Sequence, residues 1–138
     1  MQTSIKTCNN SSFTSLELII VIIMIGIMAA VAIPAMHKLI ERTRGERTIA
    51  NIELTKDAYR AYIIRYPNFS GNPLDLAEIN NLFHLELTDP WFNYNPVTVS
   101  NTSLSLTTTR TGSGEVITYS YYLSDDNSTW GGNWPWLP

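Results

Sequence analysis

The feature that most constrains this chain is an apolar run near its start, from Leu16 to Met36, which reads LELIIVIIMIGIMAAVAIPAM. From Phe13 to Ile33 the segment has 21 residues. An α-helix rising about 1.5 Å per residue crosses a bilayer core of roughly 30 Å at that length. A secretory signal peptide also begins with an apolar stretch, but its apolar core is shorter. The run therefore predicts a membrane-spanning helix.

One acidic residue, Glu17, lies inside this run. A carboxylate within a bilayer costs a few kcal/mol or more, depending on its depth, unless it has a partner or reaches the interface. From the residue alone, two interpretations stay open. Glu17 either lies near the interface, where it favours the positive end of the helix macrodipole, or it has a function.

The surrounding stretch, SFTSLELIIVIIMIGIMAAVAIPA, resembles the N-terminal segment of type IV prepilins and type II secretion pseudopilins. In that family a short polar leader precedes a mature chain that begins with Phe or Met. The fifth mature residue is Glu and the twenty-second is Pro. Counted from Phe13, Glu17 is the fifth residue and Pro34 the twenty-second. The leader would be residues 1–12, which contain one lysine and no acidic residue.

The resemblance implies that a prepilin peptidase cleaves between Ser12 and Phe13 and that the new Phe13 amine is methylated. Ser12 stands where the family usually has glycine, and serine is also small. The resemblance further implies that Glu17 acts in assembly by accepting hydrogen bonds from a Phe13 amine. Because a buried carboxylate needs a buried cation, the amine of a neighbouring subunit would set the register of an incoming copy.

Two residues predict a weak point in the helix. Pro34 lacks an amide proton and disrupts the helix around Ala30, and Gly26 lowers helix propensity. The residues alone are compatible with a simple kink. The resemblance favours a kink combined with local melting between Gly26 and Pro34 as the helix leaves the membrane for a filament.

The charges around the run give no clean topology. Lys6 precedes it, whereas Lys38, Arg42, Arg44 and Arg47 follow it, so the positive-inside rule places the C-terminal side in the cytoplasm. The resemblance implies the reverse, with the leader cytoplasmic and the head periplasmic across a bacterial inner membrane. The whole chain has a formal net charge of −3, which argues against a nucleic-acid partner.

Residues 37–66 predict an amphipathic continuation of the helix. Apolar side chains recur at helical spacing, which indicates a stripe that packs against the head. The helix is expected to stop at Tyr66, because a residue before proline avoids helical geometry. The stripe comprises Ile49, Ile52, Tyr59, Tyr62, Ile63 and Tyr66.

Residues 67–138 are rich in Asn, Ser, Thr, Gly and Pro, which is typical of a loop-rich head. Asn72 and Pro73 predict a helix N-cap and first turn, with the helix reaching about Phe83. Residues 88–91 predict a turn, and residues 111–114 a hairpin between the last two strands. The candidate strands are Val97–Val99, Ser103–Thr109 and Glu115–Leu123. These elements predict an α+β fold, and the resemblance implies the type IV pilin fold, a long helix packed on a small antiparallel sheet.

The head also resembles major pseudopilins of type II secretion. Asp89-Pro90-Trp91, followed by Asn93 and Tyr94, is similar to their DPWGNPY stretch, with Phe92 in place of its glycine. As in those proteins, an acidic loop follows a tyrosine-rich strand. Asp125 and Asp126 in this loop could supply oxygen ligands to calcium, and an ordinary polar turn is the alternative. No other cofactor is expected.

Cys8 is the sole cysteine, so no intramolecular disulfide is possible. Trp130, Trp134 and Trp136 are expected to pin the C-terminal segment to the sheet. His37 and His84 are isolated, and neither has the spacing of a metal or nucleophile site, so no enzyme is predicted.

The resulting hypothesis is a structural subunit of a type IV pilus-like filament, most similar to a major pseudopilin. Its expected partners are further copies of itself in a helical homopolymer, minor pilins or pseudopilins, a prepilin peptidase, the inner-membrane assembly platform, and lipid before assembly. A type IV pilin of a surface pilus, for adhesion, motility or DNA uptake, is one alternative. A single-pass membrane-anchored binding protein that never polymerises is another, and a secreted enzyme with an unusual signal peptide is a third.

Overall fold

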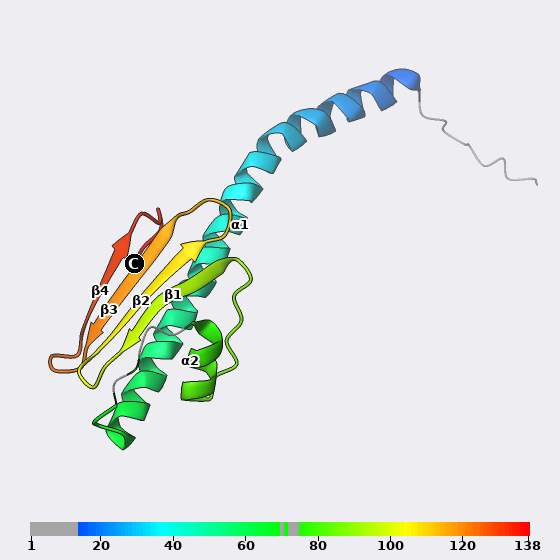
Figure 1. The fold of residues 1–138 in the computed structure, drawn as a ribbon. Helices are drawn as coiled ribbons and strands as arrows, with labels where there is room; N and C mark the ends of the chain where they lie inside the picture. Colours follow the sequence, from blue (N-terminus) through cyan, green and yellow to red (C-terminus); the bar gives the residue numbers. More distant parts are fainter. Residues whose placement is uncertain (1–13, 70, 72–74) are drawn as a thin grey trace, which may run out of the picture. The chain divides into compact units, whose positions relative to one another are not determined.

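The computed structural model describes residues 14–69, 71 and 75–138. The elements in these residues are α1 (Ser15–Arg65), α2 (Leu76–Phe83), β1 (Phe92–Val99), β2 (Ser103–Arg110), β3 (Val116–Tyr122) and β4 (Asn127–Gly132) (Figure 1). The coarse prediction of a long N-terminal helix followed by an antiparallel sheet is therefore confirmed. The chain forms two compact units, Met1–Leu39 and Ile40–Pro138.

The described part of the first unit is the beginning of α1. The helix starts at Ser15 and runs on through Gly26 and Pro34. Ser12 and Phe13, where cleavage and methylation are predicted, lie outside the described residues. In the first unit α1 has no described chain folded against it, and its side chains are almost all exposed.

In the second unit, the remaining part of α1 buries most of the predicted apolar stripe. Ile52, Tyr59 and Ile63 are buried, and Ile49 and Tyr62 pack partly against the same core. The helix ends within one residue of the predicted stop, but the prediction that Tyr66 belongs to the buried stripe was wrong. Tyr66 follows the last helical residue, Arg65, and its side chain is 49% exposed. The buried stripe also includes small and polar residues that an apolar pattern does not reveal, namely Gly45, Thr48, Asn51 and Thr55.

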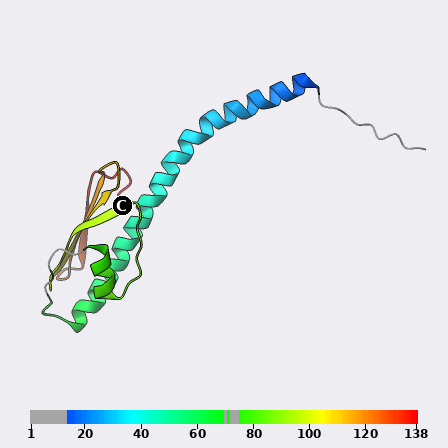
Figure 2. The same ribbon diagram turned by 45° about the vertical axis from the view of Figure 1, so that its right-hand side comes forward.

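The four strands form an antiparallel meander in the order β1-β2-β3-β4. One face of the sheet packs on the second part of α1, and Figure 2 shows the sheet nearly edge-on beside this helix. The ring of Tyr59 meets that of Tyr121 edge to face at 6.0 Å, and the Tyr59 hydroxyl donates to the Ser100 carbonyl oxygen. The inward-facing strand residues are Phe92, Tyr94, Val97, Val99, Leu104, Leu106, Thr108, Ile117, Tyr119 and Tyr121.

A shift in strand register explains why β1 is longer than its sequence signal. The pairing of β1 with β2 changes register between Tyr94 and Val97, so the buried positions change parity at Asn95 and Pro96. Simple alternation therefore reveals the end of the strand but not its first half. The predictions for β2 and β3 are confirmed to within one residue at each end.

Two glycines make the predicted hairpin between β2 and β3 possible. Gly112 and Gly114 have φ angles of 94° and 74°, a left-handed backbone that other residues rarely adopt. In contrast, β4 was not predicted. Its residues were assigned to a polar loop and a tail, because an exposed edge strand of Asn, Ser, Thr and Gly has no apolar alternation.

The start of α2 corrects the predicted cap. The helix begins at Leu76, and its N-cap is Asp75 rather than Asn72, which lies outside the described residues together with Pro73. The Asp75 carboxylate accepts from the Glu78 amide at 2.9 Å, and the Glu78 carboxylate accepts from the Asp75 amide at 3.4 Å. This reciprocal capping box stabilises the helix start at Asp75.

Candidate functional site

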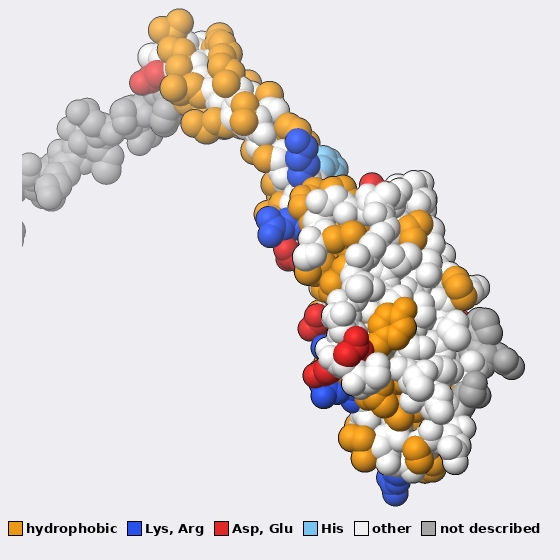
Figure 3. Space-filling view, turned by 90° about the vertical axis from the view of Figure 1, so that its left-hand side faces the viewer, with side chains coloured by type: hydrophobic (Ala, Val, Ile, Leu, Met, Phe, Trp, Pro, Cys, Tyr) orange, Lys and Arg blue, Asp and Glu red, His pale blue; other side chains and the backbone are white. Residues whose placement is uncertain are grey.

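The most unusual feature of the chain is the apolar first part of α1. Between Leu16 and Met36 its large apolar side chains are 45% to 72% exposed, whereas Ile52 further along the same helix is fully buried. Figure 3 shows apolar side chains over much of this segment. The helix contains a stretch that is long and apolar enough to cross a membrane. So large an apolar surface favours contact with lipid or with another protein.

Glu17 closes a capping box at the start of α1. Its Oε2 accepts from the Thr14 amide at 3.0 Å and from the Thr14 hydroxyl at 2.9 Å. The Thr14 hydroxyl in turn accepts from the Glu17 amide at 3.3 Å. The carboxylate therefore has local partners within one turn of helix, and this T-x-x-E pattern is a cap signal that the sequence analysis missed.

Gly26 and Pro34 lie in the interior of α1. A Cβ atom built on Gly26 meets no atom within 4 Å, so no contact inside the described chain requires a glycine there. Pro34 has no amide proton to donate to the Ala30 carbonyl, yet helix continues on both sides of it. Both residues that weaken the helix lie within α1, and melting of the segment between them remains a prediction.

In the second unit, a charged cluster ties α1 to the sheet. The Arg110 guanidinium of β2 donates two hydrogen bonds to the Glu41 carboxylate, at 3.0 and 3.1 Å. Arg44 donates to the same carboxylate at 2.5 Å, and Arg42 pairs with Glu46 at 2.8 Å. The i,i+3 and i,i+4 pairs follow from sequence spacing. The Glu41–Arg110 contact joins residues 69 positions apart, and no local pattern indicates it.

Asp89 organises the predicted turn before β1. One carboxylate oxygen accepts from the amides of Trp91 and Phe92, each at 3.1 Å. The other accepts from the Thr48 hydroxyl of α1 at 2.6 Å and from the Tyr94 hydroxyl at 3.1 Å. Burial and the neighbouring carboxylate raise the pKa of Tyr94 well above its usual range. The turn is therefore a structural connection between α1 and β1.

Trp91 in this turn lies against two cations of α1. The guanidinium carbons of Arg44 and Arg47 lie 5.2 and 5.5 Å from the centre of a Trp91 ring, within the range of cation–π attraction. The Arg47 guanidinium also donates to the Thr88 hydroxyl at 2.9 Å. The predicted turn thus uses part of the basic cluster that follows the apolar run.

The acidic loop before β4 forms contacts of its own. The Asp126 carboxylate accepts from the Tyr121 hydroxyl at 2.7 Å and lies 3.5 Å from the Arg60 guanidinium. Asp125 accepts from the Ser124 hydroxyl at 3.1 Å. Burial, followed by the hydrogen bond to Asp126, raises the pKa of Tyr121 to about 12. Among the described residues no group of three or more Asp, Glu, His or Cys converges on a metal position, and calcium binding by Asp125 and Asp126 stays a prediction.

The C-terminal segment packs against α1 at a glycine. Trp134 is 4% exposed, and its ring lies so close to Gly45 that a Cβ atom there would overlap the indole. The Trp134 ring also meets Phe92 at 5.3 Å and Trp136 at 5.3 Å. Trp130 in β4 contacts Tyr119 at 4.5 Å. The prediction that tryptophans pin this segment is confirmed for Trp130 and Trp134, while Trp136 remains 37% exposed.

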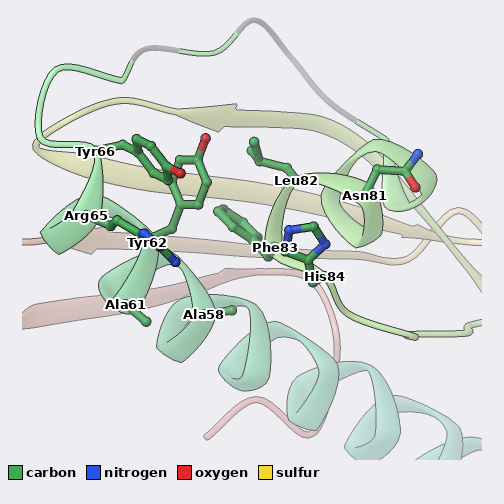
Figure 4. Close-up of a pocket in the computed structure, with 9 residues that line it drawn as sticks. All are labelled: Ala58, Ala61, Tyr62, Arg65, Tyr66, Asn81, Leu82, Phe83 and His84. Carbon is green, nitrogen blue, oxygen red and sulfur yellow. The ribbon is translucent and has the colours of Figure 1, made fainter.

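A cleft of about 430 Å³ lies where the end of α1 meets α2. Figure 4 shows Tyr62 and Tyr66 on one side and Leu82, Phe83 and His84 on the other. The Tyr62 ring contacts Tyr66 at 4.8 Å and Phe83 at 5.5 Å. The cleft was not predicted, because α2 comes beside α1 through the tertiary fold. His84 forms the left-handed C-cap of α2, and His37 lies in the first unit.

No family model matches this chain, and neither a curated protein nor a solved structure matches it.

Proposed function

We propose that this chain is a structural subunit of a type IV pilus-like filament, most similar to the major pseudopilin of a type II secretion system. It is cleaved between Ser12 and Phe13, methylated at Phe13 and held by α1 in a bacterial inner membrane until it polymerises. The observation that carries the proposal is the uncovered first part of α1, whose apolar side chains are 45% to 72% exposed. These side chains need lipid before assembly and neighbouring helices afterwards.

Glu17 is the residue to which we assign the assembly step. In the single chain its carboxylate is satisfied by Thr14. A methylated Phe13 ammonium from a neighbouring subunit would offer a full positive charge, and hydrogen bonds between charged groups are stronger than neutral ones. Replacement of the Thr14 bonds by this ion pair would fix the axial register of the incoming copy.

Gly26 and Pro34 serve the change of environment in this proposal. A helix in lipid keeps its backbone groups paired, and Pro34 leaves the Ala30 carbonyl without its usual donor. Among the described residues nothing packs against the Gly26 position, so in this proposal the segment between the two residues is free to lengthen. The leader stays cytoplasmic and the head periplasmic, and the assembled filament is periplasmic or extracellular.

The turn at Asp89 favours the pseudopilin over a surface pilin. Its sequence is similar to the DPW stretch of major pseudopilins, and its Asp89 accepts hydrogen bonds from both α1 and β1. The proposed partners are minor pseudopilins, the prepilin peptidase and the inner-membrane assembly platform. Calcium at Asp125 and Asp126 belongs to the same proposal. The alternatives are a pilin of a surface pilus and a membrane-anchored binding protein that stays monomeric.

The proposal is tested by the intact mass and N-terminal sequence of the protein isolated from its native host. A chain that begins with methylated Phe13 is the expected result. A chain that still begins with Met1 would overturn the processing step and would favour the monomeric membrane anchor. Electron microscopy of sheared material then checks for filaments.

A further inference from the structure

Two surface features of the second unit stay unused by the function proposed above. The first is an exposed apolar knob on the C-terminal segment, formed by Pro135, Trp136 and Pro138. Trp136 is 37% exposed and rests edge-on against Trp134, which is itself wedged against Gly45. The knob is therefore held on a rigid base. Tryptophan is among the residues that most often dominate the energy of protein interfaces.

The second feature is the aromatic cleft between the end of α1 and α2. Its volume of about 430 Å³ lies within the range of sites that take an aromatic group. Its lining combines the Tyr62, Tyr66 and Phe83 rings with the Arg65 side chain. Within the described part of the chain, no acidic group forms an ion pair with Arg65. The guanidinium is thus available to lie over an aromatic ring.

The knob and the cleft are chemically matched. An indole that enters the cleft meets three aromatic rings, and rings of this kind attract one another edge to face or offset. Arg65 adds a cation–π contact. The chain already uses this chemistry internally, where Arg44 and Arg47 lie over Trp91. The prolines limit the conformations of the knob, which lowers the entropy lost on docking.

The two features are separated along α1, so one chain cannot join its own knob to its own cleft. The knob sits next to Gly45, and the cleft adjoins Arg65, 20 residues further along the helix. At about 1.5 Å per residue this corresponds to about 30 Å. A contact between different surfaces of identical chains does not close on itself unless the rotation closes, and it otherwise generates an open helical array.

We infer that the Trp136 knob of one copy docks into the Tyr62–Tyr66–Phe83 cleft of the next copy. This inference rests on the proposed function, because the contact operates between heads in the filament. The heads would thus contact one another in addition to the contacts made by the apolar part of α1. The occupant of the cleft is thus a second copy of this chain.

The first test is chemical cross-linking of assembled filaments. Asn81 at the rim of the cleft and Pro138 beside the knob are both exposed and are replaced by cysteine, in a chain that also carries Cys8→Ser. A short bis-maleimide is expected to yield a ladder of covalent multimers. The matched control pairs Pro138→Cys with Ser105→Cys on the outward face of β2, and it is expected to remain monomeric.

The second test is assembly of surface variants. Trp136→Ala and Tyr66→Ala are each expected to lower the amount of filament roughly tenfold or more, as the loss of a hot-spot residue does. The double variant is expected to assemble as well as the single variant that assembles less. Trp136 and Tyr66 are partners in the same contact, so the second substitution removes nothing further. Tyr122→Ala, which removes an aromatic side chain of similar exposure from β3, is the control and is expected to assemble normally.

The outcomes separate this inference from the proposed function. Filaments of the Asn81→Cys, Pro138→Cys variant that form in wild-type amount but give no ladder, or equal ladders in both cysteine pairs, would overturn the docking contact and leave the filament intact. Normal assembly of Trp136→Ala, with tryptophan fluorescence that shows a folded head, would also overturn it. A wild-type chain that is never found in filaments would overturn both.

Discussion

The two parts of α1 are one helix in two opposite environments. In the second unit the helix buries Ile52, Tyr59 and Ile63 against the sheet, whereas from Leu16 to Met36 its apolar side chains stay exposed. Helix-forming tendency does not account for the difference, since both parts are helical. The difference is that the sheet of the same chain packs against the second part of the helix, whereas no described segment packs against the first part. The second part is stabilised from within the protein, and the first part needs a partner or a lipid phase.

The polar contacts of the two parts differ in the same way. At the start of α1, Glu17 bonds to Thr14, three residues away. In the second unit, Thr48 bonds to Asp89 and Glu41 to Arg110, across 41 and 69 residues. Long-range contacts make the head a cooperative unit. Changes within it should alter stability, whereas changes in the first part should alter insertion and assembly.

The largest effect on head stability is expected from Asp89→Ala. Loss of the carboxylate leaves the buried Tyr94 hydroxyl and the amides of Trp91 and Phe92 without this acceptor, and leaves the Thr48 hydroxyl with only the Arg44 carbonyl oxygen, which should cost about 3 kcal/mol or more. Urea unfolding of the full chain in detergent, followed by tryptophan fluorescence, measures the loss. All four tryptophans lie at or after Trp91, so the signal reports the head alone. Asp125→Ala is the control, and an equal loss in both variants would contradict the role of Asp89.

A matched pair of glycine variants compares the two parts of α1 directly. Gly45→Ala is expected to cost about 1–3 kcal/mol of head stability, because the added methyl group overlaps the Trp134 ring. Gly26→Ala should leave it unchanged, since apart from the adjacent helix backbone no described atom lies within 4 Å of the new Cβ. The same unfolding experiment applies. Equal stabilities for the two variants would show that Trp134 does not pack on α1 as described.

Raising the pH above 10 should lower the stability of the second unit through two of its tyrosines. The folded head raises the pKa of Tyr121 from its ordinary value of 10.0 to about 12, and raises that of Tyr94 as well. Both groups favour the neutral form, so their contribution is complete below pH 10 and is lost as the pH rises towards 12. Thermal unfolding across this range measures the loss. A midpoint that stays constant to pH 12 would contradict the prediction, and Tyr121→Phe should reduce the slope.

The smallest effect on head stability is expected from Glu17→Val. The residue lies in the first unit, so unfolding of the head should change by less than about 0.5 kcal/mol. Membrane insertion should persist, and the filament yield should fall, because the proposed partner of the Phe13 amine is lost. Fractionation and electron microscopy measure the two. Polymerisation at the wild-type level would refute the assembly role of Glu17.

The parts of the fold that depend on local patterns were predictable from the sequence. The apolar run, the buried stripe on α1, the strands β2 and β3 and the hairpin between them each follow from periodicity or turn residues. The first half of β1 was missed because the register shift after Tyr94 interrupts alternation. The start of α2 was misplaced because the Asn72-Pro73 pair matches the pattern of a helix start, whereas the helix is capped by the reciprocal bonds of Asp75 and Glu78.

The sequence by itself determined that this chain has a helix long enough to span a membrane, an acid near its start and a separate polar head. Hydropathy and spacing along the chain carry that information. The tertiary structure alone decided that β4 pairs with β3, that Asp89 joins Thr48 to Tyr94, and that Trp134 packs on Gly45. The β3–β4 hairpin is local, but its edge strand has no apolar alternation that would reveal it. The Thr48–Asp89 and Gly45–Trp134 contacts join residues 41 and 89 positions apart. Their partners come together only when the sheet folds onto α1 and the buried polar groups find each other.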